Sequence, residues 1–206
     1  MKDKLLIIGA GGHGKVAADI AIKLNKWESI AFLDDDVATK KCMGLKVIGK
    51  VDDYFRYRKE AEFFVAIGDN AMRELLQEKL RTDGSNIISL VHPEAIIGLD
   101  VEIGEGTVIM AGAVVNSSSN IGKGCIINTS SSLDHDTILE DYVHISPGVR
   151  SAGNVNIGKG TWLGIGSVVS NNVNIYSGCK IGAGAVVIKH INEPGTYVGV
   201  PVRRIN

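Results

Sequence analysis

The stretch from Ile97 to Asn192 reads, in groups of six, IGLDVE, IGEGTV, IMAGAV, VNSSSN, IGKGCI, INTSSS, LDHDTI, LEDYVH, ISPGVR, SAGNVN, IGKGTW, LGIGSV, VSNNVN, IYSGCK, IGAGAV and VIKHIN. The first position is Ile, Leu or Val in 15 of these 16 hexads, with Ser151 as the exception, and the fifth position holds small or compact residues. A short repeat of this kind indicates a β-helix solenoid. The first position then fills its centre, the fifth packs beside it, and Gly, Asn and Asp turn the corners.

The hexad resembles the sequence signature of the left-handed parallel β-helix, which has three faces per coil and departs from the usual right-handed crossover. Three hexads then form one coil, so that residues at the same place in successive coils stack at about the strand spacing of 4.8 Å. We therefore predict a left-handed β-helix of hexapeptide repeats, with a little over five coils, in a domain that spans residues 91–206.

Composition and charge narrow the classes of function. The chain has 206 residues and a net charge of −1, which argues against nucleic acid as a partner. No apolar run approaches the length of a membrane span, and the first residues, Met1–Lys4, lack a secretory signal. Cys125 and Cys179 occupy fifth positions three coils apart, too distant for a disulfide. We expect a cytoplasmic protein with no membrane span.

The first ninety residues alternate between apolar strands and amphipathic helices. Strands are predicted at Leu5–Ile8, Ile30–Leu33, Phe63–Ile67 and Asn86–Leu90. Helices are predicted at Lys15–Leu24, with Val16, Ile20 and Leu24 at helical spacing, and around Met72–Leu80. This alternation predicts a Rossmann-like α/β domain at residues 1–90, with a small, parallel, doubly wound sheet about half the size of a full dinucleotide fold.

Three glycines follow the first predicted strand. Gly9, Gly11 and Gly14 match the pattern G-x-G-x-x-G, and Asp34 lies at the usual spacing of the acidic residue in this motif, about 20 residues beyond Gly14. This pattern favours a nucleotide-type ligand, with its phosphates on the helix N-terminus. Alternatively, the glycines only permit close packing of the helix on the sheet. His13 and the run of three aspartates suggest a ligand with more polar groups than a nicotinamide.

The polar residues that the hexad does not require suggest a reaction. His135 and Asp136 occupy positions three and four of LDHDTI, near a corner of the prism, and Gly153 lies three hexads, or one coil, after His135. A His beside a carboxylate can accept a proton from a nucleophile, and a glycine on the next coil leaves a backbone N–H accessible to an oxyanion. These are the parts that direct acyl transfer needs. The alternative is that His135 and His144 are ordinary surface histidines.

His135 and His144 lie half a coil apart, which places them on different sides of one prism. They can share a site only across a subunit boundary, so we predict a homo-oligomer with sites between prisms. A three-histidine zinc site would need the same arrangement, but His–Asp adjacency suits proton transfer better than a ligand set. We therefore expect no metal. His92 and His190 are interpreted as structural.

The whole chain resembles the bacterial hexapeptide acyltransferases of the NeuD/PglD type, which acetylate sugars. The resemblance rests on GAGGHGK at Gly9–Lys15, LDDD at Leu33–Asp36 and AIGDN at Ala66–Asn70, and on LDHD, YVHIS, SAGNVNIG and the closing YVGVPVRRI. It implies a homotrimer that uses acetyl-CoA in glycan biosynthesis. The implied acceptor is the 4-amino group of a UDP-linked 4-amino-4,6-dideoxy sugar.

The resemblance also implies roles for individual residues. His135 corresponds to the general base, and Asp136 stands where those N-acetyltransferases often have Glu. The positions that resemble the acetyl-CoA site are His144, Gly153, Ile165 and Gly182. The positions that match the pocket for the UDP-sugar are Gly12, His13, Asp34, Asp35, Gly68, Asn70 and Arg73.

Three other functions remain open from the sequence. The same histidine could assist O-acetylation of a sialic acid or a related sugar hydroxyl. A β-helix could carry a nucleotide-sugar binding protein without catalytic activity. The glycine pattern could belong to a small NAD-binding oxidoreductase.

Overall fold

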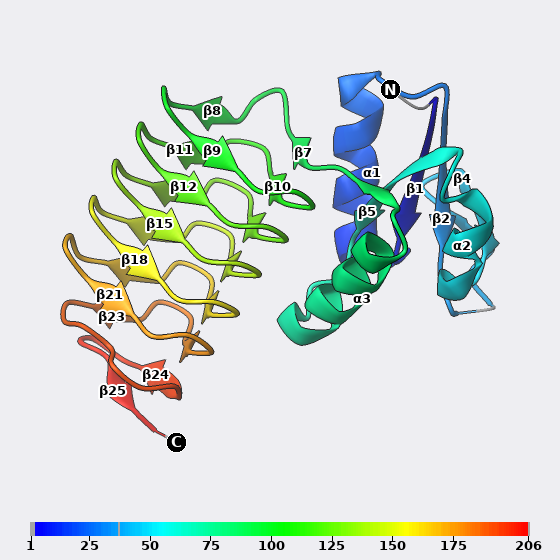
Figure 1. Ribbon diagram of the computed structural model, residues 1–206. Coiled ribbons are helices and arrows are strands. Elements are labelled where there is room, and N and C mark those ends of the chain that lie inside the picture. The colour runs from blue at the N-terminus through cyan, green and yellow to red at the C-terminus, as the bar shows by residue number, and fades with distance from the viewer. Residues whose placement is uncertain (1–2, 37, 206) are drawn as a thin grey trace. The chain divides into compact units, whose positions relative to one another are not determined.

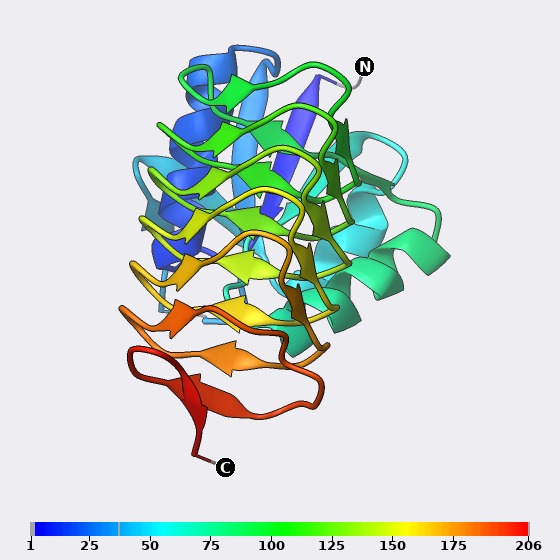
Figure 2. The same cartoon turned by 90° about the vertical axis from the view of Figure 1, so that its left-hand side faces the viewer.

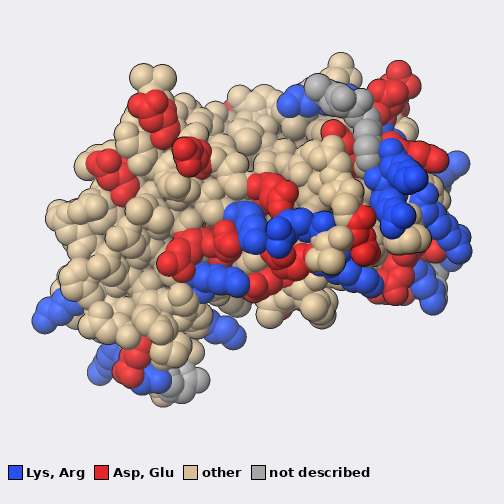
Figure 3. All heavy atoms as spheres, in the orientation of Figure 1, with Lys and Arg blue, Asp and Glu red and all other residues tan. Residues whose placement is uncertain are grey.

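The computed structural model describes residues 3–36 and 38–205, which form two compact units, Met1–Pro93 and Glu94–Asn206. Met1 and Lys2, two of the four residues inspected for a secretory signal, lie outside the described residues. Within the described part of the chain, no helix is both long and apolar enough to cross a membrane. On the face drawn in Figure 3, basic and acidic side chains lie interspersed, and neither sign forms a continuous field.

The first unit is built on a six-stranded sheet with the order β3-β4-β2-β1-β5-β6. Its strands are β1 (Lys4–Ile8), β2 (Ser29–Leu33), β3 (Lys41–Cys42), β4 (Leu45–Gly49), β5 (Ala61–Val65) and β6 (Asn86–Ile87), and β7 (Leu90–Val91) follows. All neighbours pair in parallel except β3 and β4, which form an antiparallel hairpin. The predicted small parallel sheet is confirmed, and the hairpin is an addition that the apolar pattern did not indicate.

Helices cover both faces of this sheet (Figure 1). They are α1 (Gly12–Leu24), the 3-10 helix η1 (Val51–Asp53), α2 (Tyr54–Tyr57) and α3 (Asn70–Thr82). Leu6, Ile8 and Phe63 pack with Tyr54 of α2 and Leu80 of α3 in one buried cluster. On the opposite face, a Cβ at Gly14 of α1 would lie 3.3 Å from Phe32. The two faces are therefore covered by different helices, as a doubly wound sheet requires.

Helix α1 differs in detail from its prediction. It begins at Gly12, before the expected start at Lys15, and Val16, predicted to face the core, is 39% exposed. The buried face consists of Gly14, Ala17, Ala18, Ile20 and Ala21. Small residues let the helix axis approach the sheet closely, so the larger Val16 is turned outward.

The second unit is a prism of short parallel strands stacked in coils (Figures 1 and 2). Its first face comprises β8 (Ile96–Ile97), β11 (Val114–Val115), β14 (Ser132–Leu133), β17 (Arg150–Ser151), β20 (Val168–Val169) and β23 (Val186–Val187). Its second face comprises β9 (Glu102–Ile103), β12 (Asn120–Ile121), β15 (Ile138–Leu139), β18 (Asn156–Ile157) and β21 (Asn174–Ile175). Its third face comprises β10 (Val108–Ile109), β13 (Ile126–Ile127), β16 (His144–Ile145), β19 (Trp162–Leu163), β22 (Lys180–Ile181), β24 (Thr196–Val198) and β25 (Arg203–Arg204).

Each two-residue strand in the repeat holds the sixth position of one hexad and the first position of the next. The register advances by three hexads per coil, so that Ile126, His144 and Trp162 follow one another on the third face. First and fifth positions face the interior: Leu133 and Thr137, for example, are 0% exposed. Fourth positions adopt the left-handed backbone region, as at Asp136 with φ 57°. This explains the Gly, Asn and Asp residues at the corners. The three faces of stacked parallel strands confirm the predicted β-helix of hexapeptide repeats.

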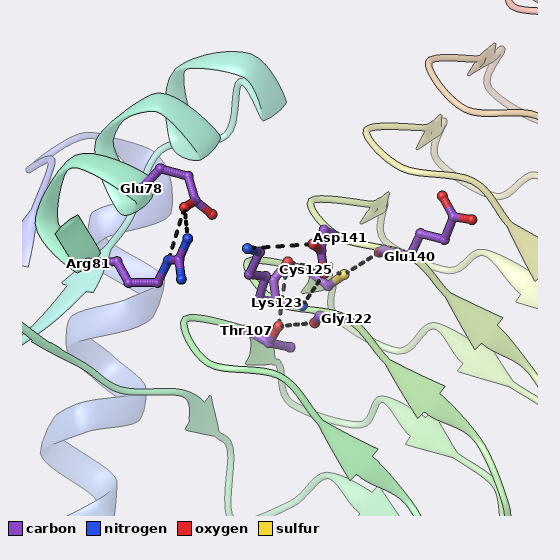
Figure 4. Close-up of polar contacts among 8 residues, drawn as sticks. All are labelled: Glu78, Arg81, Thr107, Gly122, Lys123, Cys125, Glu140 and Asp141. Carbon is purple, nitrogen blue, oxygen red and sulfur yellow. Dashed lines mark hydrogen bonds and ion pairs between the residues drawn. The ribbon is translucent and has the colours of Figure 1, made fainter.

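Two of the polar groups inside the coils bond to the backbone of the next coil in Figure 4. The Thr107 hydroxyl donates to the Gly122 carbonyl at 2.8 Å, and the Cys125 thiol donates to the Glu140 carbonyl at 3.2 Å. Cys125 and Cys179 are buried free thiols, as predicted. These contacts stiffen the scaffold on which the corner residues stand.

Candidate active site

His135 and Asp136 form a hydrogen-bonded pair at the corner between β14 and β15. His135 Nδ1 lies 2.7 Å from Asp136 Oδ2, and both side chains are more than half exposed. An ionised carboxylate only accepts, so Nδ1 carries the proton and Nε2 of the neutral ring carries a lone pair. The left-handed backbone of Asp136 turns its short side chain back onto the neighbouring ring. The corner therefore presents a base at Nε2.

A second carboxylate, which sequence reasoning missed, fixes the backbone of His135. Asp134 Oδ1 accepts the His135 N–H at 2.9 Å and the Asn116 side-chain amide at 2.9 Å. These two hydrogen bonds, in that order, lower the pKa of Asp134. Asn116 lies one coil before Asp134. Because residues at the same place in successive coils stack, this contact could have been predicted from the sequence.

The electrostatic setting favours the protonated form of His135. The hydrogen bond to Asp136 raises the pKa of His135 above its ordinary value, and the charges of Asp134 and Asp136 act in the same direction. Because the imidazole is exposed to solvent, this shift contributes little to the stability of the fold. It makes the ring a stronger base but leaves it protonated over more of the acidic pH range.

Gly153 lies directly against the imidazole. A Cβ built on Gly153 would sit 2.6 Å from His135 Nε2 and 2.7 Å from Cε1, so no side chain fits there unless the ring moves. The Asn154 N–H donates to the His135 carbonyl at 2.9 Å, which places the two corners one coil apart as predicted. The glycine therefore does more than expose its N–H, because its missing side chain makes room for the ring.

His144 stands on the third face, half a coil from the His135 corner. Its ring stacks on Trp162 at 5.7 Å between centroids, and its Nε2 lies 3.5 Å from the Asn128 side-chain amide. Ile165 and Gly182 lie at a third place, the corner between the third and first faces. Ile165 is 59% exposed. One prism therefore does not bring His144, Ile165 and Gly182 together with His135.

The glycines after β1 divide into two kinds. A Cβ at Gly14 would lie 2.0 Å from the Gly9 carbonyl oxygen, and Gly9 has φ 100°. These two glycines serve close helix–sheet packing. Gly11 and Gly12 have no atom within 4 Å of an added Cβ and lie exposed at the start of α1. The predicted pocket residue Gly12 therefore leaves backbone open, as does Gly68 in the loop after β5, whereas Gly14 of the glycine pattern is closely packed.

The predicted pocket carboxylates bond to loop backbone. Asp34 Oδ2 accepts the Ala10 N–H at 2.6 Å, which ties the loop after β1 to the end of β2, and its Oδ1 accepts the Asp36 N–H at 2.7 Å. Asp35 Oδ1 accepts the Val51 N–H at 3.0 Å. These carboxylate oxygens therefore fix the backbone of the loops at the predicted pocket.

The loop after β5 contains the other predicted pocket residues. Arg73 is 1% exposed, and its guanidinium donates to the Gly68 carbonyl at 3.2 Å and to Asn70 Oδ1 at 2.8 Å. Arg73 thus lies inside the loop and orients Asn70. His13 is half-buried, with its ring 6.3 Å from that of Phe64.

A cavity of about 250 Å³ opens beside the ends of β2 and β4. It is lined by Asp34, Asp36, Thr39, Lys40, Val47, Gly49, Lys50 and Asp53. Of these residues, Asp34 was predicted as a pocket residue, and Asp36 belongs to the run of three aspartates that suggested a polar ligand. Lys40 and Lys50 escaped notice because they lie in the hairpin region to which the apolar pattern assigned no element. The two lysines share the cavity with the carboxylates of Asp34, Asp36 and Asp53, so its lining carries both signs of charge near the predicted nucleotide site.

Comparisons with known proteins cover both units. Residues 4–80 match the family described as PglD N-terminal domain. The chain is 36% identical to the acetyltransferase domain of PglB from Neisseria gonorrhoeae FA1090, solved with acetyl coenzyme A, over 100% of both chains with a TM-score of 0.96. It is 34% identical to PerB from Caulobacter crescentus, solved with CoA and GDP-perosamine, over 98% of this chain and 97% of that one, with a TM-score of 0.93. The chain belongs to the NeuD/PglD-type hexapeptide-repeat sugar acetyltransferases.

A curated relative of this acetyltransferase is the GDP-perosamine N-acetyltransferase of Escherichia coli O157:H7. The two are 29% identical over 169 residues, which is 79% of this chain and 76% of the relative. Within residues 3–36 and 38–205, the acetyltransferase contains no group of three or more His, Cys, Asp or Glu side chains placed to hold a metal ion.

Proposed function

We propose that this acetyltransferase transfers the acetyl group of acetyl-CoA directly to the 4-amino group of a UDP-linked 4-amino-4,6-dideoxy sugar, with His135 as the general base. Membership of the family makes the chain an acetyl-CoA-dependent sugar acetyltransferase. The observation that carries the finer proposal is the His135–Asp136 pair, oriented at 2.7 Å and seated against Gly153.

The reaction follows from the tautomer of His135. The sugar amine gives a proton to Nε2 as its nitrogen attacks the thioester carbon, and the C–N bond forms. The C–S bond then breaks, and the CoA sulfur leaves and takes up the proton. Asp136 keeps the proton on Nδ1 and stabilises the imidazolium that forms during transfer.

The Gly153 N–H is the proposed hydrogen-bond donor to the thioester oxygen. Elsewhere in the prism, third-position N–H groups bind carboxylates: Lys123 N–H donates to Asp141 Oδ1 at 3.0 Å, and Lys159 N–H donates to Glu140 Oε2 at 2.7 Å. Within the described residues, the Gly153 N–H makes no hydrogen bond. The Gly153 N–H could therefore donate to an oxyanion on the thioester, as third-position N–H groups donate to carboxylates elsewhere in the prism.

The first unit supplies features suited to a nucleoside diphosphate. Gly11 and Gly12 present open backbone at the N-terminus of α1, and Lys40 and Lys50 line the cavity beside Asp34. Acetylation of UDP-linked and GDP-linked 4-amino sugars, measured side by side, tests the nucleotide. The GDP-linked sugar is the second candidate, because PerB was solved with GDP-perosamine. Preference for the UDP-linked sugar is the expected result, and preference for GDP would revise the nucleotide but not the chemistry.

O-acetylation of a sialic acid is the other acyl-transfer function. The Escherichia coli O157:H7 relative is named a GDP-perosamine N-acetyltransferase, and an N-acetyltransferase acts on an amine. This favours an amine acceptor over a hydroxyl. Faster acetylation of free or CMP-linked sialic acid than of nucleotide 4-amino sugars would reverse this choice.

A homotrimer would bring the separated groups together. The outer residues of the first face are Ile96 (62% exposed), Val114, Ser132, Arg150, Val168 (40% exposed) and Val186, a largely apolar row that Ser132 and Arg150 interrupt midway. Such a row fits contact with other copies of the chain. The corners at its two edges carry His135 on one side and Ile165 and Gly182 on the other. Subunits packed through this face would therefore join the His135 corner of one copy to the acetyl-CoA positions of the next.

Replacing Val168 by Asp should break this assembly, because three buried carboxylates would be forced together. We expect light scattering to give a trimer for the wild type and a monomer for the variant, with acetyl transfer lost. Ile138→Asp, on the second face and similarly exposed, is the matched control and should remain trimeric. A monomeric wild type with full activity would contradict the proposed assembly.

The pH dependence of kcat/KM should report the His135–Asp136 pair. His135 must be neutral to act as a base, so activity should rise with pH through its pKa and through the titration of the substrate ammonium. Asp136→Asn removes the main cause that raises the pKa of His135, so the acidic limb should move to lower pH while the plateau falls. An acidic limb that stays in place would show that this pair does not control the rate.

A further inference from the structure

Trp162 forms an aromatic stack that the proposed chemistry has not used. It follows His144 by one coil on the third face, and the two rings lie 13° from parallel with their centroids 5.7 Å apart. This separation and angle are those of an offset-stacked aromatic pair. The indole is 45% exposed, so burial alone does not explain its fixed orientation.

Ser146 anchors the indole. Trp162 Nε1 donates to Ser146 Oγ at 2.7 Å, and Ser146 is 5% exposed. Ser146 follows closely after His144 in the chain, so the group that holds the indole belongs to the same turn of chain as the imidazole. The hydrogen bond to Ser146 therefore fixes the orientation of the indole relative to the imidazole on which it stacks.

Asn128 fixes the tautomer of His144. Asn128 Oδ1 accepts the Thr129 N–H at 2.8 Å, so the amide nitrogen is the atom that faces His144 Nε2 at 3.5 Å. This distance exceeds the usual range of about 2.7–3.2 Å, so the contact is a weak one. The amide nitrogen can only donate, so Nε2 must accept, and the neutral ring carries its proton on Nδ1. A protonated ring would place one N–H group against another.

We propose that Trp162 is a positioning residue for His144: its indole, anchored on Ser146, holds the imidazole in the plane in which Asn128 fixes the neutral ring with its proton on Nδ1. The inference rests on the proposed function, in which His144 belongs to the acetyl-CoA site. A neutral imidazole there offers a hydrogen-bond donor without adding a cation to the site in which His135 must accept a proton. A charged His144 would oppose that proton transfer through like-charge repulsion.

Tryptophan emission tests the contact between the two rings without any substrate. The chain has two tryptophans, and Trp27 lies in the first unit with its Nε1 2.7 Å from Glu62 Oε2. In a Trp27→Phe background, emission therefore reports Trp162 alone. A protonated imidazole in contact with an indole quenches its emission, whereas a neutral one does not. We expect emission to rise with pH as His144 loses its charge, and this step to vanish in Trp27→Phe/His144→Gln.

On the third face, the residue one coil after Trp162 is the charged Lys180. Its ammonium stays charged across the pH range of the titration, so it does not produce the step. Absence of the step, or its survival in the His144→Gln protein, would overturn the proposal.

Kinetics test the positioning role. Trp162→Leu removes the aromatic face and should lower kcat by roughly 10²-fold, with KM for the nucleotide sugar little changed. Trp162→Phe keeps an aromatic face but loses the bond to Ser146, so its kcat should lie between that of Trp162→Leu and that of the wild type. Unchanged turnover in Trp162→Leu would overturn the proposal. If no nucleotide amino sugar were acetylated by the wild type, the proposed function would fail, and the emission step would still decide whether Trp162 holds His144.

Discussion

Replacing His135 by alanine is expected to lower kcat by roughly 10²–10⁴-fold, with a modest change in substrate binding. The variant removes the base at Nε2, while the Gly153 N–H and the whole first unit remain. Steady-state release of CoA thiol from acetyl-CoA, with a nucleotide 4-amino sugar as acceptor, measures the effect. Because the imidazole is exposed on a corner, the fold should survive its removal.

His190→Ala provides the matched control. His190 also belongs to the prism, where its Nδ1 accepts the Asn174 N–H at 3.0 Å, but no part of the proposed reaction uses it. Its removal should leave kcat close to that of the wild type. Undiminished turnover in His135→Ala would remove His135 from the role of base.

Replacing Gly153 by alanine should lower kcat by about 10²-fold, because a misplacement of the reacting group by about 1 Å has this effect. The new methyl group would lie 2.6 Å from His135 Nε2, so the imidazole must move. The prism itself should tolerate the change, since Ala111 occupies the same third position of its hexad. The measurement is kcat beside the melting temperature, and we expect only kcat to fall.

A double-mutant cycle separates this mechanism from a general loss of structure. If Gly153→Ala acts by displacing the imidazole, it should have little further effect in the His135→Ala background. Independent, multiplicative losses in the double variant would mean that Gly153 acts without His135.

The second unit could be predicted in detail because each position of its hexad has a fixed place in the coil. The first and fifth positions point inward along the prism, and a stacking period of three hexads correctly placed Gly153 against His135. The first unit was predicted less well. An apolar run predicts β1 and β5, but the short hairpin of β3 and β4 has few apolar residues and depends on pairing with β2.

In the candidate site, the spacing of residues predicts some contacts but not the role of every polar side chain. The same period of three hexads relates Asn116 to Asp134 and His144 to Trp162, so both contacts were available in the sequence. Gly153 is also the one glycine among the third positions of the hexads. By contrast, nothing in the sequence distinguishes a buried Arg73 that supports its loop from one that reaches a ligand, because both have the same polar neighbours.

The glycine pattern after β1 had two interpretations from sequence, close helix–sheet packing and a nucleotide-type ligand, and the structure divides its glycines between packed and open positions. Gly9 and Gly14 are required by close packing, whereas Gly11 and Gly12 leave the N-terminus of α1 open. A motif of three glycines can therefore combine a packing requirement with a surface for phosphate.

A crystal structure of the enzyme with CoA and a UDP-linked 4-amino sugar tests the central claim most directly. We expect the sugar nitrogen within about 2.6–3.2 Å of His135 Nε2, with the CoA sulfur beside it and further contacts contributed by a second copy of the chain. A sugar nitrogen far from His135, or a CoA molecule bound away from the corner that carries Gly153, would contradict the proposed mechanism.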